Sequence, residues 1–223
     1  MTAIKKPVNH LISIVVVVSG FAAAPVVQAD EPGWYLRAHG GLSNLDDTSG
    51  RTTATGSDAK LVLSTDSGSF LGMAGGYNYG NGWRAEVAWD YRSNDSTGAI
   101  DGIDVFTAGD YASNTFFLNG VYGIDIGSPW RPYLGAGLAW VQEIDVDLEA
   151  DGTEQSYSSS GEVGFQAFAG VDYPISSQWV INFELRYTNI GAIDLDAEAE
   201  AFGTVTGLDY AHTSLQIGLT YRF

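Results

Sequence analysis

Apolar and polar side chains alternate along most of this chain, and the alternation limits what the chain can fold into. In the clearest stretch, apolar residues take every second position and polar residues the positions between: Trp179, Ile181, Phe183, Leu185 and Tyr187 against Asn182, Glu184, Arg186 and Thr188. A period of two places side chains on opposite faces of a β-strand, whereas a helix shows a period of about 3.6. The sequence therefore predicts strands with one apolar face and one polar face.

The same alternation recurs in eight segments, which favours an all-β fold. The segments lie near residues 33–43, 68–79, 82–93, 111–124, 130–143, 161–173, 178–189 and 209–223. Short turns alternate with longer links near residues 44–67, 94–110, 144–160 and 190–208. An even number of strands joined in this way is typical of a closed, antiparallel up-and-down barrel with both termini on one side.

Aromatic residues gather at one end of these segments. Each predicted strand has one at its short-turn or terminal end: Trp34, Tyr77, Trp83, Tyr122, Trp130, Tyr173, Trp179, and Tyr221 with Phe223. Amphipathic rings favour the headgroup level of a bilayer, so the set indicates an interfacial girdle. A soluble β-sandwich is the alternative, and it would scatter or bury these rings. We therefore predict an eight-stranded antiparallel transmembrane β-barrel.

The N-terminus has the features of a secretory signal peptide. Lys5 and Lys6 precede an apolar stretch from Leu11 to about Val18, and Val27-Gln28-Ala29 provides a small-x-small ending. This apolar stretch is too short to span a membrane comfortably. We expect residues 1–29 to be cleaved and residues 30–223 to form the barrel domain; an uncleaved anchor helix is the alternative.

The charge balance and the absence of cysteine exclude several functions. The chain has 10 Lys plus Arg against 27 Asp plus Glu, a net charge of -17, and no cysteine. Nucleic-acid binding needs clustered basic residues, so we expect no nucleic-acid partner. Without cysteine, a disulfide framework, a Cys-ligated metal, a thiol nucleophile and a lipoprotein anchor are all excluded.

The last predicted strand has a distinctive ending. Ser214-Leu-Gln-Ile-Gly-Leu-Thr-Tyr-Arg-Phe223 is apolar at alternate residues and ends in Phe. This segment resembles the signal by which outer-membrane barrels are recognised for insertion. The mature chain as a whole resembles the small eight-stranded outer-membrane barrels of the OmpA-like and opacity-protein type.

The resemblance implies a place in the outer membrane of a Gram-negative bacterium, with both termini in the periplasm. It also implies contact with membrane lipid and lipopolysaccharide, and insertion by the barrel assembly machinery through Tyr221 and Phe223. Many OmpA-like proteins continue into a soluble peptidoglycan-binding domain. Because this sequence stops at Phe223, we expect no tethering to the cell wall by that route.

The polar faces of the strands predict a charged lumen. If the apolar faces contact lipid, the opposite parity places these residues inside, together with His39 and Gln216: Arg37, Arg84, Glu86, Asp90, Arg92, Glu184, Arg186 and Arg222. The interior of an eight-stranded barrel is just wide enough for side chains to fill it. Because buried charges without partners are costly, we predict a paired network that plugs the lumen. A narrow gated pathway for ions or small solutes is the alternative.

Carboxylates concentrate in two of the long links. They occupy alternate positions after the fifth and seventh strands: Glu143, Asp145, Asp147, Glu149 and Asp151, then Asp194, Asp196, Glu198 and Glu200. If each link continues the parity of its strand, every carboxylate points inward and the Ile, Val, Leu and Ala residues between them point outward. The sequence then predicts a wall that extends past the membrane, with a ring of carboxylates at its mouth.

Such a ring would attract hard cations such as calcium or magnesium. The segment from Asp147 to Gly152 is similar to the start of a calcium loop, but Ser158 stands at the twelfth position, where a bidentate Glu belongs. We therefore expect no dedicated cofactor and at most weak binding of divalent cations.

One residue pair raises an enzymatic alternative. His212-Thr213-Ser214 is similar to the His-x-Ser spacing of the lipid A deacylases, and residues two apart share a strand face. Leu215 follows where that family carries a polar residue, and the register turns the pair toward the lumen. We therefore predict a non-enzymatic protein with a structural or surface-interaction role. A cation-selective or small-solute channel is the alternative, and a lipid hydrolase is a more distant one.

Overall fold

A computed structural model describes residues 31–54, 56–106, 108–150, 153–198, 201 and 203–223. The predicted signal peptide, residues 1–29, lies outside the described residues. In the described part of the chain, no helix is long and apolar enough to cross a membrane.

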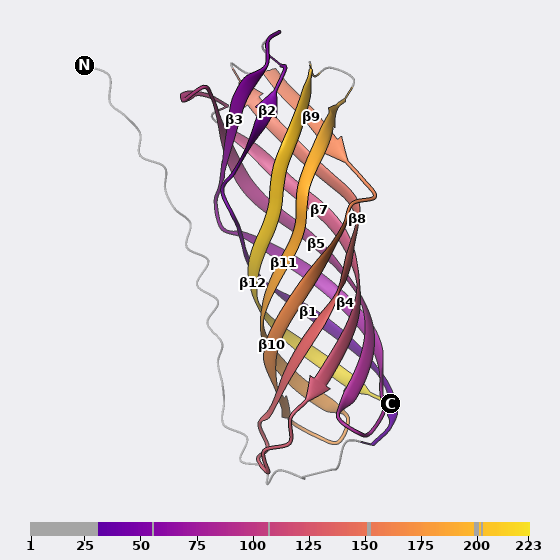
Figure 1. Cartoon of the computed structure of the whole chain (residues 1–223). Coiled ribbons are helices and arrows are strands. Elements are labelled where there is room, and N and C mark those ends of the chain that lie inside the picture. The colour runs from indigo at the N-terminus through magenta and orange to yellow at the C-terminus, as the bar shows by residue number, and fades with distance from the viewer. Residues whose placement is uncertain (1–30, 55, 107, 151–152, 199–200, 202) are drawn as a thin grey trace, which may run out of the picture.

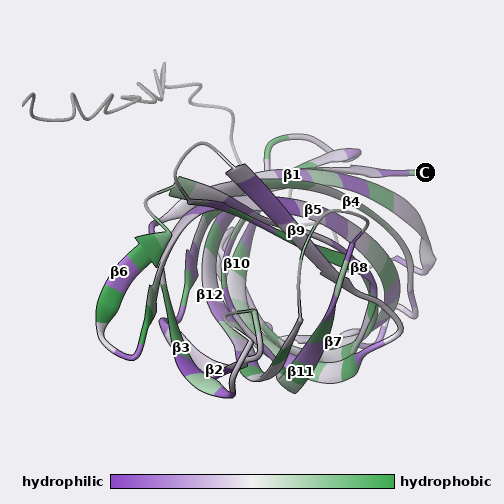
Figure 2. Cartoon of the chain, turned by 90° about the horizontal axis from the view of Figure 1, so that it is seen from above, coloured by the Kyte–Doolittle hydropathy of each residue, from purple (hydrophilic) through white to green (hydrophobic). Residues whose placement is uncertain are grey.

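Eight long strands form a closed antiparallel barrel, as the sequence predicts (Figures 1 and 2). They are β1 (Gly33–Leu45), β4 (Gly68–Asn78), β5 (Trp83–Ile100), β7 (Ala108–Gly123), β8 (Arg131–Ala150), β10 (Val163–Pro174), β11 (Trp179–Ala197) and β12 (Thr204–Arg222). Each strand pairs with the next in this order, and β12 pairs with β1. Closure gives every strand a hydrogen-bonded neighbour on both sides, which a wall in lipid requires.

The wall continues beyond the ends of β1, β4 and β10, because shorter strands take their places. These are β2 (Thr48–Thr52), β3 (Ala59–Thr65) and β9 (Thr153–Ser159), with β6 (Ile103–Phe106) folded back beside β5. β2 and β3 join β12 to β5, and β9 lies between β8 and β11. We call this upper part of the wall the extension. Much of the predicted long links is therefore strand (Figure 1).

The lower part of the wall has apolar side chains outside and polar ones inside. Outward residues such as Leu36, Leu71 and Leu138 are 57%, 72% and 60% exposed. Inward residues such as Glu86 and Arg186 are 2% and 0% exposed. A soluble protein would have the reverse arrangement, so this part of the barrel suits lipid outside and a self-contained polar interior.

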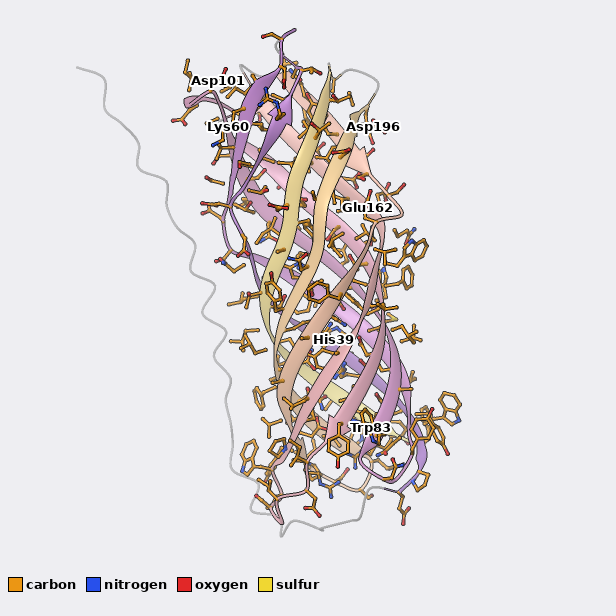
Figure 3. All side chains as sticks on the ribbon, in the orientation of Figure 1. His39, Lys60, Trp83, Asp101, Glu162 and Asp196 are labelled. Atoms are coloured by element: carbon orange, nitrogen blue, oxygen red, sulfur yellow. The ribbon has the colours of Figure 1, made fainter. Side chains whose placement is uncertain are left out.

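The aromatic girdle consists of four ring pairs at the end with the short turns. Each pair joins a Trp to a Tyr on the neighbouring strand, with ring centroids 4.7 to 5.2 Å apart: Trp34–Tyr77, Trp83–Tyr122, Trp130–Tyr173 and Trp179–Tyr221. Figure 3 shows Trp83 at this end, His39 midway, and Lys60 and Asp101 at the far end of the extension. The C-terminus also lies at the girdle end (Figure 1).

Two β-bulges reverse the facing of the strands where the wall enters the extension. The register of β8 against β7 shifts at Gln142, and that of β11 against β12 shifts at Ile190. An extra residue in one strand turns the following side chains to the other face. Beyond the bulges, Ile144 and Ile193 are therefore buried at 0% and 1% exposure, inside the barrel.

The extension consequently has an apolar interior, which is the main hydrophobic cluster of the described chain. It includes Leu61, Leu63, Phe106, Tyr111, Val141, Ile144, Val146, Leu148, Tyr157, Ile190, Ile193, Leu195, Val205, Leu208 and Tyr210. Because the extension stands above the lipid-facing section, it needs an ordinary buried core to hold its wall together in water.

Cysteine labelling will test which end of the barrel faces outward, since the chain has no cysteine of its own. Single variants Ser57→Cys and Ile103→Cys lie in the exposed extension, and Ile126→Cys and Ser177→Cys lie at the short turns. On intact cells, a membrane-impermeant maleimide should label the first pair and spare the second. Labelling of only the second pair would reverse the orientation.

Candidate functional site

The interior of the lower barrel holds a cluster of buried charged side chains from β1, β5 and β11, which we call the luminal network. Its central members are Arg37, His39, Glu86, Asp90, Glu184 and Arg186, all at most 6% exposed. These residues alternate with lipid-facing apolar residues along their strands, so the period of two alone brings them into one compartment.

Arg37 bridges two carboxylates from different strands. Its Nη2 donates to Glu86 Oε1 at 2.6 Å, and its Nη1 lies 3.7 Å from Glu184 Oε2. Each carboxylate also accepts a hydrogen bond from a buried phenol: Tyr35 donates to Glu86 at 3.0 Å, and Tyr133 donates to Glu184 at 2.8 Å. Charge-assisted bonds of this kind are stronger than neutral ones, which favours one fixed arrangement.

Arg186 and His39 extend the network across the lumen. Arg186 Nη2 lies 2.7 Å from Glu184 Oε1, and its Nη1 lies 3.4 Å from Asp90 Oδ2. His39 Nε2 lies 2.8 Å from Asp90 Oδ1. The last contact depends on Gly72, because a Cβ there would lie 2.3 Å from Asp90 Oδ1 and 2.5 Å from His39 Nε2. A chain of charged contacts thus connects β1, β5 and β11.

A second ion pair lies closer to the girdle. Arg84 Nη1 donates to Asp172 Oδ2 at 2.8 Å, and Asn182 donates to the other oxygen of Asp172. Arg222 is half-buried at this end, beside Arg84 in a small pocket. The luminal residues predicted from the sequence do not include Asp172, Tyr35 and Tyr133, although all three share the inward parity of their strands. That parity is the signal that could have found them.

Arg92 lies apart from these ion pairs. Its Nη2 donates to Ser214 Oγ at 3.2 Å, its Nη1 contacts His212 Nε2, and its guanidinium lies 5.1 Å from the Phe70 ring centroid. None of the described carboxylates lies within 4.0 Å of it. His212 and Ser214 are each 1% exposed and face the lumen, so this His-x-Ser pair has no contact with lipid.

The predicted direction of the acidic residues is wrong. Because the bulges at Gln142 and Ile190 reverse the facing, the carboxylates after them lie on the outer wall and the apolar residues between them fill the interior. The outward, exposed or half-exposed carboxylates are Glu143, Asp145, Asp147, Glu149, Asp194, Asp196 and Glu198. Asp151 and Glu200 lie outside the described residues. The expected ring inside the mouth is therefore an acidic outer wall.

The acidic wall brings like charges together. Asp147 lies opposite Asp110 on β7, and Glu149 lies opposite Glu154 on β9. Partial burial, together with Glu143, Glu198 and Asp147, raises the pKa of Asp145 above its usual value of 3.8. An open groove of about 620 Å³ follows this wall, with Asp110, Glu143, Asp145, Asp147, Glu154 and Glu198 among its lining residues. Within the described ranges, no three or more acidic or histidine side chains are grouped to hold a metal ion.

The predicted insertion signal lies at the girdle end of β12. Tyr221 packs against Trp179 with ring centroids 4.9 Å apart and against Phe223 at 5.1 Å. The Phe223 side chain is 73% exposed, and its backbone N–H donates to Trp34 O at 3.1 Å. The last residue is therefore tied to the first strand while its ring stays on the outer surface.

Comparison with known proteins identifies related chains and folds. Residues 13–223 match the family described as outer membrane protein beta-barrel domain. Outer membrane protein W of Vibrio cholerae is 26% identical over 183 residues, covering 78% of this chain and 81% of that protein. Outer membrane protein W of Escherichia coli is 27% identical over 139 residues, covering 55% and 65%.

Two solved structures share the fold. The outer membrane protein OprG of Pseudomonas aeruginosa superposes with a TM-score of 0.64 at 19% identity, covering 86% of this chain and 96% of that chain. Neisserial surface protein A superposes with a TM-score of 0.53 at 18% identity, covering 86% and 99%.

Glu184→Gln tests the luminal network. The substitution keeps the size and polarity of the side chain but removes the negative charge between Arg37 and Arg186. Breaking a buried ion pair should lower the free energy of unfolding by about 3 kcal/mol. Urea unfolding in lipid vesicles, followed by heat-modifiable migration, measures this loss. Asp58→Asn breaks an exposed pair with Arg51 and should leave stability nearly unchanged; equal effects of the two variants would contradict the network.

Asp145→Asn tests repulsion on the acidic wall. Because the folded pKa of Asp145 is raised, its ionisation destabilises the folded state above that pKa and has no effect below pH 3.8. The variant should therefore be more stable than the natural chain at neutral pH and equally stable in acid. Urea unfolding at both pH values measures the difference. A destabilised variant at neutral pH would show that the carboxylate has a favourable partner.

Proposed function

The chain belongs to the outer membrane protein β-barrel domain family, and we propose that it is a non-enzymatic surface protein of the outer membrane whose lumen is closed to ions. The observation that carries this proposal is the Arg37 bridge between Glu86 and Glu184, continued by Arg186 to Asp90. These contacts fill the cross-section of a barrel that is just wide enough for side chains. An ion would have to break several charge-assisted bonds to pass.

The extension is the part of the molecule that meets the surroundings in this proposal. Its apolar interior keeps the wall rigid, and its acidic outer face carries closely spaced carboxylates. With the termini in the periplasm, this face lies at the level of lipopolysaccharide, whose phosphates are also negative. Divalent cations shared between the two anionic surfaces would relieve their repulsion, so binding is diffuse and weak for any single ion.

A second candidate function is passage of small apolar molecules from outside into the membrane. On the side of β11 that faces β9 and β10, no ladder pair lies between Asn189, which faces Phe165 of β10, and Asp196, which faces Ser158 of β9, and in this stretch β11 pairs only with β12. Ile193 and Leu195 lie in this stretch and belong to the apolar interior. A wall segment without ladder bonds can separate at lower cost than its neighbours, so apolar solutes could leave the interior sideways.

Conductance in planar bilayers tests the closed lumen against the alternative of a cation-selective channel. The purified natural chain should give no steady current, because the charged contacts leave no continuous water path. Glu184→Gln, which removes the central carboxylate, should increase the frequency of brief openings. A reproducible cation-selective current through the natural chain would overturn the closed-lumen proposal and favour the channel.

A further inference from the structure

A row of aspartates crosses three neighbouring strands on the outer face of the extension. Asp95 of β5 lies opposite Asp110 of β7, and Asp110 lies opposite Asp147 of β8. All three side chains are exposed or half-exposed, and none of the ion pairs among the described residues includes them. Like charges directly opposite one another destabilise a sheet, so a cation bound along the row would stabilise this part of the wall.

An open groove of about 380 Å³ lies over this row, where β5 and β7 separate. The β5–β7 ladder ends at the Asp95–Asp110 pair, and the residues just beyond it on both strands line the groove: Ser96, Thr97, Ala108 and Gly109. Six carboxylates also line it: Asp66, Asp95, Asp110, Asp147, Glu149 and Glu154. A ligand in this groove would therefore meet carboxylates along its whole length.

The groove also contains a hydroxyl group that has no hydrogen-bond partner. Ser96 is 3% exposed, and its Oγ makes no hydrogen bond to the described residues. A Cβ on Gly109 would lie 3.0 Å from this oxygen, so the Ser96 side chain points toward Gly109 across the separated strands. Buried polar groups normally have a partner. Ser96 therefore offers a hydrogen-bond acceptor to a ligand that lies between β5 and β7.

The spacing of the carboxylates suits a linear ligand better than a single metal ion. Neighbouring strands are roughly 5 Å apart, and alternate residues along one strand are roughly 7 Å apart. Within the described ranges, no three acidic side chains are grouped to hold a metal ion. Ammonium groups joined by short methylene chains have a similar spacing, and each ammonium has several N–H groups to donate. Such a molecule can place one ammonium beside each carboxylate.

We propose that this groove binds a linear polyamine. The ammonium groups lie along Asp95, Asp110 and Asp147, and one of them donates a hydrogen bond to Ser96 Oγ. A single exposed ion pair is weak, but several ion pairs to one ligand act together. The proposal goes beyond the surface role and the diffuse binding of divalent cations, because it assigns one groove and one class of ligand.

Titration calorimetry of the purified protein in phosphatidylcholine nanodiscs tests the proposal, because this lipid has no net charge. The probes are spermidine and hexaamminecobalt(III), which carry the same charge in a linear and in a compact form. The natural chain should bind spermidine tighter than the cobalt complex by roughly tenfold or more. Equal affinities would show that only charge is recognised, and would overturn the proposal.

Asp110→Asn removes the central carboxylate of the row and should weaken spermidine binding by roughly tenfold. Asp209→Asn is the matched control: it removes the same charge from an exposed position on the extension, and Asp209 does not line the groove. The control should bind spermidine as the natural chain does. Equal affinities of the two variants for spermidine would show diffuse binding to the acidic wall, and would overturn the proposal. If Asp110→Asn does not fold, the comparison of the two probes on the natural chain still decides.

Ser96→Ala tests the hydrogen bond without changing the charge of the groove. Because the hydroxyl makes no hydrogen bond to the described residues, the variant should fold normally, which heat-modifiable migration will check. Its affinity for spermidine should fall roughly threefold, the effect of losing one hydrogen bond, while its affinity for the cobalt complex stays the same. Unchanged spermidine affinity in folded Ser96→Ala would contradict the position proposed for the ligand.

Discussion

Closure of the backbone hydrogen-bond ring is the constraint on which the rest of this molecule depends. A strand in lipid cannot leave N–H and C=O groups unpaired, so the ladder from β1 around to β12 must return to β1. Once the ring is closed, every second residue faces a compartment that neither lipid nor bulk water enters freely. Charged residues in that compartment must satisfy one another, which explains why Glu86 and Glu184 each hold an arginine and a tyrosine.

The interior changes from charged to apolar along the axis of the barrel, and the reason is the medium outside. In the membrane, the outer face must be apolar, so polar residues go inside. In the extension, the outer face meets water, so carboxylates can stand outside and Ile144, Leu148 and Ile193 form a core. The bulges at Gln142 and Ile190 make this exchange within continuous strands. Arg92 and His212 lie where the two kinds of interior meet.

This division of the interior connects the fold with the proposed functions. The charged half supports a barrel that does not conduct, because its groups are held by direct contacts. The apolar half supports a rigid surface structure, and it includes the stretch of β11 that pairs only with β12, where we propose that apolar molecules exchange. On the outer face of that half, partial burial and the neighbouring carboxylates raise the pKa of Asp145. Each proposed function therefore depends on a different part of the barrel wall: its charged inner face, its apolar inner face or its acidic outer face.

The sequence by itself determined the eight strands, the facing of their residues in the membrane and the girdle. These follow from the period of two, because a strand in lipid needs an apolar side chain at every second position. It placed Arg37, Glu86 and Glu184 inside before any contact was known. Only the tertiary structure decided which charged residues pair, since Asp172 of β10 reaches Arg84 of β5 across the lumen, and Gly72 of β4 makes room for His39 of β1 against Asp90 of β5.

The tertiary structure also decided the direction of the acidic residues. Apolar residues take the even positions from Leu134 to Trp140 and again from Ile144 to Leu148, and the odd positions from Trp179 to Tyr187 and again at Ile193 and Leu195, so the parity is the same on both sides of each bulge. Residues of this parity face the lipid before the bulge and the core of the extension after it. A periodicity shows which residues share a face, but it does not show which medium that face meets. One inserted residue in a strand exchanges the inward and outward faces for all residues that follow it.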